Sequence, residues 1–128
     1  MLSAQLGGFR FHPGQQSEDG AAYHAEMRAL ADAGIHVLAL DVTDDASMQA
    51  GISKIVSASG RIDVLVNNAG YGHEGTLEES SLDEVRRQFE VNVFGAVAVA
   101  KAVLPFMRAR RRGHILNITS MGGIATFP

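Results

Sequence analysis

Residues 61–72, RIDVLVNNAGYG, contain a short apolar run that ends abruptly on two asparagines, an alanine and a glycine. A tight turn after a strand accounts for one asparagine and one glycine, because both residues tolerate positive φ. The second asparagine and the small Ala69 indicate a backbone that something else approaches closely. The stretch therefore predicts a buried strand whose end has a role beyond turning the chain.

The segments around this stretch alternate between helical and strand patterns. Helices are expected at residues 24–34, 44–60 and 81–112, and strands at residues 35–42, 61–67 and 114–120. Asp44 suits the start of the second helix, and Ser81 with Glu84 forms a capping box at the start of the third. Pro105 lies inside the third helix, where it would kink or break it. The alternation predicts a parallel sheet covered by helices on both faces.

Composition and charge exclude several classes of function. The 128 residues are 46% hydrophobic and 20% charged, which is typical of a soluble domain, and the formal net charge of −3 argues against a nucleic-acid surface. The chain has no cysteine, which excludes disulfides and thiolate chemistry and fits a cytoplasmic location. No stretch approaches the roughly 20 apolar residues of a membrane span, and the first residues lack the features of a secretory signal. Neither a nucleic-acid nor a membrane partner is expected.

Two local patterns have plain structural interpretations. The run RARRR at residues 108–112 would place cations at the C-terminal end of the long helix, where they complement the helix dipole and keep the end solvated. His73 and His114 have no partner at metal-ligand spacing, so no metal site is expected.

Residues able to contact a polar ligand follow each predicted strand. In chain order these are Asp41 and Val42, then Asn67, Asn68, Ala69 and Gly70, then Thr119 and Ser120. The carboxyl ends of parallel strands lie along one edge of a sheet, and ligands of open α/β sheets bind beyond that edge. The sequence therefore predicts one site to which all three strand ends contribute.

Four of these motifs together resemble the classical short-chain dehydrogenase/reductase family. They are Asp41-Val42, Asn67-Asn68-Ala69-Gly70, Asn92 within FEVNVFG, and Ser120 within NITSMGG. Their order and spacing both match, and the resemblance covers about residues 25–128. It implies an oxidoreductase that transfers hydride between NAD or NADP and a carbonyl or secondary alcohol of a small molecule, and a homo-oligomer for the full-length form.

The resemblance also implies a role for each matching residue. Asp41 would accept a hydrogen bond from the adenine amino group, with the Val42 backbone beside it. The backbone of Asn67, Asn68, Ala69 and Gly70 would lie along the cofactor. Asn92 would interrupt its helix and hold a water molecule in a proton relay. Ser120 would orient and polarise the substrate oxygen, where negative charge develops during hydride transfer.

Two parts of the family pattern are missing from this sequence. No Thr-Gly-x-x-x-Gly-x-Gly turn, which would hold the cofactor pyrophosphate, is present. The family's Tyr-x-x-x-Lys pair is also missing, because Tyr23 and Tyr71 are followed four residues later by Met27 and Gly75. We therefore expect no tight cofactor binding and no turnover by this chain alone.

The fold class expected is α/β, with a partial doubly wound (Rossmann-like) parallel sheet. Residues 1–23 are expected to be irregular or poorly ordered, and residues 24–128 to form an incomplete dinucleotide-binding domain. The weak periodicity of residues 1–23 suggests sequence foreign to the family, from a misassigned start or a shifted reading frame. Two alternatives stay open: a non-catalytic nucleotide-binding or structural fragment, and a sugar-nucleotide epimerase-like protein, which the NNAG form disfavours.

Overall fold

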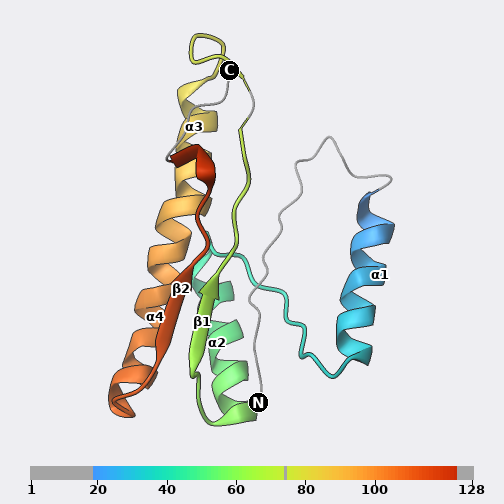
Figure 1. Ribbon diagram of the computed structural model, residues 1–128, viewed down its shortest axis with the longest axis vertical. Helices are drawn as coiled ribbons and strands as arrows, with labels where there is room; N and C mark the ends of the chain where they lie inside the picture. Colours follow the sequence, from blue (N-terminus) through green and yellow to red (C-terminus); the bar gives the residue numbers. More distant parts are fainter. Residues whose placement is uncertain (1–18, 74, 124–128) are drawn as a thin grey trace.

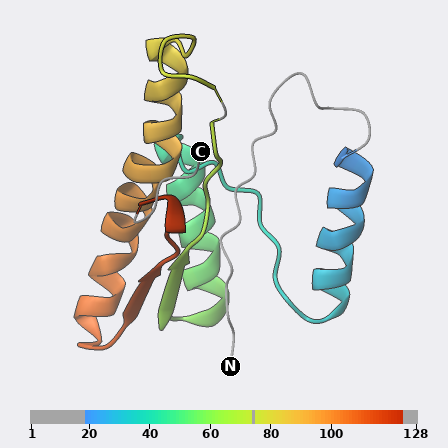
Figure 2. The ribbon, with the colours of Figure 1, turned by 45° about the horizontal axis from the view of Figure 1, so that its top comes forward.

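A computed structural model describes residues 19–73 and 75–123 of the chain (Figure 1). The elements in chain order are α1 (Asp19–Asp32), α2 (Asp45–Ser59), β1 (Val64–Asn67), α3 (Leu82–Phe89), the π-helical segment η1 (Glu90–Gly95), α4 (Ala96–Ala109), β2 (His114–Asn117) and the 3-10 turn η2 (Met121–Gly123). Helix α1 stands apart from the other elements, as both ribbon views show (Figure 2). The described residues thus form a mixed α/β structure, as predicted.

Strands β1 and β2 form a parallel pair. Val64 lies opposite His114 and Asn67 lies opposite Asn117. The helical segment from α3 to α4 crosses over between the two strands, which confirms the expected parallel connection. Backbone hydrogen bonds extend the ladder beyond both ends, from the His114 amide to the Asp63 carbonyl and from the Ile118 amide to the Asn67 carbonyl.

The core lies between α2, α4 and one face of this sheet. It consists of Leu40, Val42, Met48, Ile52, Ile62, Leu65, Val99, Val103 and Met107. Its members come from α2, α4, β1, the segment before α2 and the connection between α2 and β1, and α4 contacts both α2 and β1. Burying a side chain of this size contributes roughly 1.5–3 kcal/mol, so this cluster is the main stabilising feature of the described residues.

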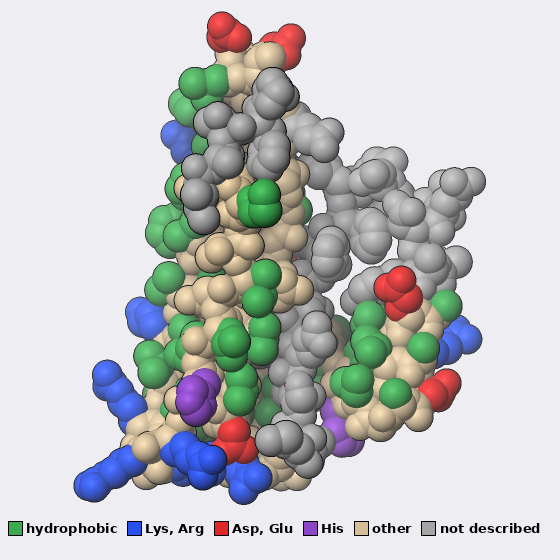
Figure 3. Space-filling view, in the orientation of Figure 1, with side chains coloured by type: hydrophobic (Ala, Val, Ile, Leu, Met, Phe, Trp, Pro, Cys, Tyr) green, Lys and Arg blue, Asp and Glu red, His purple; other side chains and the backbone are tan. Residues whose placement is uncertain are grey.

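Within residues 19–73 and 75–123 no helix packs on the second face of the sheet, whereas helices were predicted on both faces. Successive strand residues point to opposite faces, and Leu65 is buried whereas Val64 is 43% exposed. On β2, Leu116 is 47% exposed. Hydrophobic side chains are visible over this side of the molecule in Figure 3. Among the described residues, α2 and α4 pack on one face only.

Residues 35–42 do not form the strand that their apolar pattern predicts. Within the described ranges they have no strand assignment, although Leu40 and Val42 are buried. A strand needs a hydrogen-bonded neighbour, and the sheet of the described residues contains β1 and β2 alone. Leu40 and Val42 are therefore buried in the core, but residues 35–42 do not form the backbone hydrogen bonds of a strand within the described part of the chain.

The helix ends follow the predicted capping chemistry. The Asp44 side chain accepts a hydrogen bond from the Ala46 amide at the start of α2, and Gly60 ends that helix with a φ of 71°. The capping box of α3 is present in full, from Ser81 to Glu84. The hydroxyl and the backbone amide of Ser81 both donate to the Glu84 carboxylate, and these hydrogen bonds lower the pKa of Glu84.

Helix α1 begins earlier than predicted. Its first residue is Asp19, so residues 19–23 are helical rather than irregular. The remainder of the expected irregular segment, residues 1–18, lies outside the described residues.

The long helix is interrupted at η1, around Asn92, whereas Pro105 lies inside α4 without ending it. The helical run Leu82–Ala109 is long and apolar enough, by length and composition alone, to cross a membrane. This corrects the expectation that no stretch approaches a span. One such helix is weak support for a membrane protein, because core helices of soluble proteins have the same composition. Here α4 contributes Val99, Val103 and Met107 to the core.

Candidate functional site

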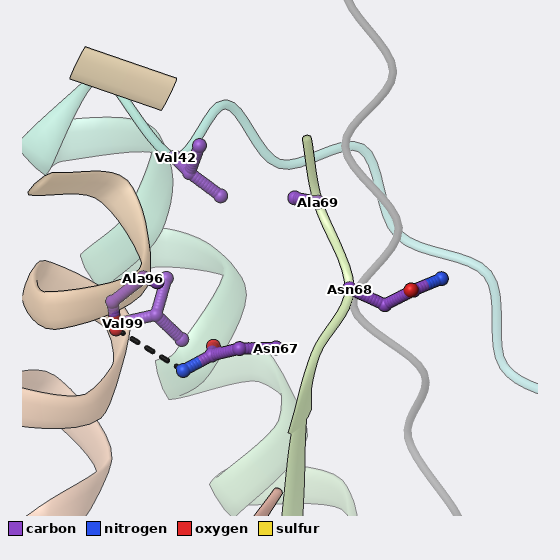
Figure 4. Close-up of a pocket in the computed structure, with 6 residues that line it drawn as sticks. All are labelled: Val42, Asn67, Asn68, Ala69, Ala96 and Val99. Atoms are coloured by element: carbon purple, nitrogen blue, oxygen red, sulfur yellow. Dashed lines mark hydrogen bonds between the residues drawn. The ribbon is translucent and has the colours of Figure 1, made fainter. Parts of the chain in front are cut away.

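The end of β1 meets the segment before α2 and the first turn of α4. Together they form a hollow lined by Val42, Asn67, Asn68, Ala69, Ala96 and Val99 (Figure 4). The structure thus brings together Val42 with Asn67, Asn68 and Ala69, whereas the predicted residues Asp41 and Gly70 are not among those that line the hollow. The lining is mostly small and apolar, and the hollow has a volume of about 10 Å³.

The two adjacent asparagines point in opposite directions. Asn67 extends toward α4, whereas Asn68 points away from the other lining side chains (Figure 4). The Asn67 side-chain amide donates to the Ala96 carbonyl at 3.2 Å and to Asn117 Oδ1 at 2.9 Å. The first asparagine therefore ties β1 to α4 and β2, and the second is oriented away from that network.

Asn117 is a site residue that the sequence analysis missed. It lies opposite Asn67 in the parallel register, at the end of β2. Its signal in the sequence is that an asparagine ends both of these strands, since amides in register at parallel strand ends can hydrogen-bond to each other. That inference requires the register, which the sequence alone does not supply.

Asn92 binds the loop that follows NNAG. Its Oδ1 accepts from the Tyr71 amide at 3.0 Å and its Nδ2 donates to the Tyr71 carbonyl at 2.8 Å. Gln88 donates to the same carbonyl at 3.3 Å. The Asn92 side chain thus pairs with one peptide unit on each side of Tyr71, and its place in the π-helical segment η1 confirms the predicted interruption of the helix.

The glycine of NNAG is explained by this contact. A Cβ built at Gly70 would lie 3.0 Å from Asn92 Oδ1. The group that approaches this part of the backbone in the structure is therefore a side chain of the same protein. A second close approach occurs at Gly95, where a Cβ would lie 2.7 Å from Val42 Cγ2.

Asp41 is held in a turn before α2. Its Oδ1 accepts from the backbone amide of Thr43 at 2.9 Å and from the Thr43 hydroxyl at 2.7 Å. Its own amide donates to the Ser47 hydroxyl at 3.0 Å. These bonds fix the direction of the chain at Val42, which lines the hollow.

Ser120 lies beyond the end of β2, at the same edge of the sheet, and is exposed. Its hydroxyl oxygen accepts from the Gly122 amide at 3.2 Å, and its carbonyl accepts from the Gly123 amide at 3.1 Å. Both bonds belong to the turn that leads into η2. Ser120 is therefore part of the strand-end edge but is not among the residues that line the hollow.

No group of three or more His, Asp or Glu side chains suited to a metal ion occurs in the described ranges. His73 Nε2 lies 2.8 Å from the Ser80 hydroxyl oxygen. That oxygen also donates to the Thr76 carbonyl at 2.8 Å, so the loop before α3 is closed by local hydrogen bonds.

The chain is similar to known proteins over most of its length. The family model of short chain dehydrogenases matches residues 5–128. This match begins well before residue 25 and so argues against the hypothesis that residues 1–23 are foreign to the family. A 3-ketodihydrosphingosine reductase from Bacteroides thetaiotaomicron is 47% identical over 94 residues, covering 73% of this chain and 35% of that protein.

Two solved structures show the same relationship. A short-chain dehydrogenase from Streptomyces avermitilis is 38% identical with a TM-score of 0.73, over 81% of this chain and 39% of that chain. The structure of ElxO with NADP bound is 32% identical with a TM-score of 0.72, over 88% of this chain and 46% of that chain. The chain thus spans between 35% and 46% of the length of these relatives. By sequence, by fold and by its strand-end motifs, this chain belongs to the short chain dehydrogenase family.

Proposed function

We propose that this chain forms the central part of an NAD(P)-dependent oxidoreductase that transfers hydride between the cofactor and a carbonyl or secondary alcohol. The observation that carries the proposal is the meeting of Val42 with the NNAG strand end in one hollow. The similar structure of ElxO, which contains NADP, supports a nicotinamide cofactor. The relative from Bacteroides is named as a reductase of a 3-keto compound, which supports a ketone as the oxidised substrate.

We place the adenosine side of such a cofactor along the strand-end edge beside this hollow, whose own volume of about 10 Å³ has room for a group the size of one water molecule. The side chains of Val42, Ala69 and Ala96 beside that edge are small and apolar. Asp41 and the backbone from Asn67 to Gly70 would supply polar contacts along the same edge. The cofactor itself supplies the hydride chemistry, and this part of the chain holds and orients it.

Ser120 and Asn92 have different roles in this proposal. Ser120, exposed at the same edge, would donate its hydroxyl hydrogen to the substrate oxygen and stabilise negative charge there. Asn92 holds both the amide and the carbonyl of Tyr71 through its side chain. We assign the Asn92 side chain a positioning role that fixes the loop after NNAG; the proton relay of the family would have to use its main chain.

The chain as given should bind the cofactor weakly and should not turn over substrate by the family mechanism. It contains neither the Gly-rich turn nor the Tyr-x-x-x-Lys pair. Both missing parts act directly on the reaction, one by holding the pyrophosphate and the other by supplying the proton. Affinity for NADH or NADPH should therefore be weaker than micromolar, which corresponds to less than about 8 kcal/mol of binding free energy.

Titration of NADH and NADPH with fluorescence detection tests the site. Ala69→Leu should abolish saturable binding because the larger side chain fills the hollow. Ala58→Leu, on the exposed side of α2, is the matched control and should bind as the wild type does. Equal binding by both variants would refute the placement of the cofactor at this edge and would favour a structural fragment. The wild-type chain should show no dehydrogenase turnover. If it does turn over substrate, and Ser120→Ala abolishes that turnover, the claim that the chain is inactive is refuted.

The outer side of the long helix supports the homo-oligomer that the family resemblance implies. Its exposed apolar residues are Leu82, Phe89, Val93, Phe94 and Val97. Soluble monomers rarely expose a contiguous apolar surface of this kind. Sedimentation equilibrium should show self-association that Val93→Glu weakens, and a monomeric wild type would contradict this assignment.

A further inference from the structure

The turn between α4 and β2 has an arginine where a glycine would be expected. The amide of Arg111 donates to the Arg108 carbonyl at 3.0 Å, and the amide of Arg112 donates to the Met107 carbonyl at 3.1 Å. This closure places Arg111 at a φ of 52°, a left-handed conformation in which helices usually have glycine. Among the described non-glycine residues, Arg111 alone has a positive φ. A strained residue with a charged side chain points to a role for that side chain.

Positive charge is in excess around this turn. Arg108, Arg110, Arg111 and Arg112 are all exposed. Arg61, in the turn before β1, is joined to them through Asp63, which lies 3.0 Å from Arg61 Nε and 2.8 Å from an Arg110 guanidinium nitrogen. The hydrogen bond from Arg110 is the main cause of a lowered pKa of Asp63, so this carboxylate is ionised. The residues of these ion pairs and of the turn together contain one carboxylate and five guanidinium groups.

The helix dipole accounts for only part of this cluster. Arg108 is the basic residue in the last turn of α4, and the following arginines lie beyond the helix, which ends at Ala109. Dipole stabilisation falls off within the last turn. Arg111 and Arg112 therefore need another explanation.

The charges of the molecule are separated along its length. The loop before α3 and the first turn of α3 contain Glu78, Glu79, Asp83 and Glu84. Arg86 and Arg87 follow on α3, and Arg86 is paired with Asp83 at 2.9 Å, so negative charge is in excess at this end. These segments lie at the opposite end of the molecule from the α4–β2 turn (Figure 1). Figure 3 shows acidic side chains at the upper end and Lys and Arg side chains gathered at the lower end. A negatively charged surface would therefore attract one end of the protein and repel the other.

We propose that the arginine turn, Arg108 to Arg112 with Arg61, is a peripheral contact surface for membranes that contain anionic phospholipids. Clusters of this size bind anionic headgroups, and Phe106, 37% exposed one turn before Arg110, adds an aromatic ring for the headgroup region. A membrane is flat and its lipids diffuse, so it can meet several arginines on a projecting end at once. A nucleic-acid duplex is itself rounded and would reach fewer of them. The acidic end also faces away from a membrane bound in this orientation.

Co-sedimentation of the whole chain with lipid vesicles tests this proposal. Binding to vesicles of phosphatidylserine and phosphatidylcholine is expected, with no binding to phosphatidylcholine alone and with steep weakening by salt. Arg111→Gly and Arg112→Ser should each weaken binding about fivefold, because each arginine near an anionic surface contributes about that factor. Arg87→Gln, an exposed arginine on α3 at the opposite end, should leave binding unchanged.

Thermal unfolding of Arg111→Gly distinguishes weaker vesicle binding caused by the lost charge from weaker binding caused by loss of the fold. Glycine relieves the left-handed strain, so this variant should be at least as stable as the wild type while it binds vesicles more weakly. Equal binding to neutral and anionic vesicles, unchanged binding by Arg111→Gly, or an equal loss in Arg87→Gln would overturn the proposal. So would tighter binding to a labelled duplex oligonucleotide than to the anionic vesicles, which would assign the turn to nucleic acid.

Discussion

The packing of Gly95 against Val42 gives a prediction that can be worked out from the structure. Adding a methyl group in Gly95→Ala places its carbon 2.7 Å from Val42 Cγ2 and 3.0 Å from Val42 Cβ. Carbon atoms in contact are normally about 3.5–4.0 Å apart. Overpacking of this kind costs about 1–3 kcal/mol. Replacing glycine by alanine within a helix contributes about 1 kcal/mol in the opposite direction, so the net loss should be about 0–2 kcal/mol.

Because two terms oppose each other, a double-mutant cycle is the decisive form of this experiment. Val42→Ala removes the γ-carbon that makes the shortest contact and leaves the 3.0 Å contact with Cβ. In that background Gly95→Ala should be close to neutral or stabilising. The coupling between the two substitutions should therefore be about 1–2 kcal/mol, measured as the free energy of unfolding in urea.

A control at a glycine with space around it completes this test. Gly72 has no atoms within 4 Å of a built Cβ, so Gly72→Ala should show no coupling with Val42→Ala. Coupling between Gly95→Ala and Val42→Ala below about 0.5 kcal/mol, the usual scatter of additive pairs, would refute the claim that Gly95 is required by close packing beside the hollow.

Two further predictions concern hydrogen bonds that the structure shows. Asn92→Ala should lower the free energy of unfolding by about 2–3 kcal/mol, because it leaves the amide and carbonyl of Tyr71 without this partner. Faster hydrogen exchange at the Tyr71 amide would confirm that the lost hydrogen bonds are the cause. An unchanged exchange rate would contradict it. The pKa of Glu84 is lowered in the folded state by the hydrogen bonds from Ser81, so its contribution to stability is present above the ordinary carboxyl pKa of 4.5 and is lost as pH falls through the lower folded value. The stability difference between the wild type and Glu84→Gln, followed by urea denaturation against pH, should accordingly shrink on acidification; a difference that grows at low pH would show that the sign is wrong.

The local chemistry of this chain is readable from its sequence because it depends on neighbours a few residues away. The Asp44 cap, the left-handed Gly60 and the capping box at Ser81 all involve contacts within one turn. Parallel pairing of the strands followed from their separation by a long helix. The strand end at NNAG was recognisable because few residue types allow another group to come close to the backbone.

What the sequence could not supply depends on partners far away in the chain. The apolar pattern of residues 35–42 correctly indicated burial, but a strand also requires a neighbour, and the described residues provide none. The partner of Asn67 at Asn117 is fifty positions away. Asn92 was placed in the helix interruption, yet the binding of its side chain to Tyr71 required the loop geometry.

The open side of the two-stranded sheet has a practical consequence for handling this protein. Val64, Leu116 and Ile118 are 43%, 47% and 58% exposed, and β1 and β2 each have a hydrogen-bonded neighbour on one side only in the described part of the chain. Unpaired strand edges beside apolar side chains are templates for strand addition by other copies. Colloidal stability, rather than unfolding, should then limit the concentration at which the isolated chain can be studied, and aggregation should begin at this edge.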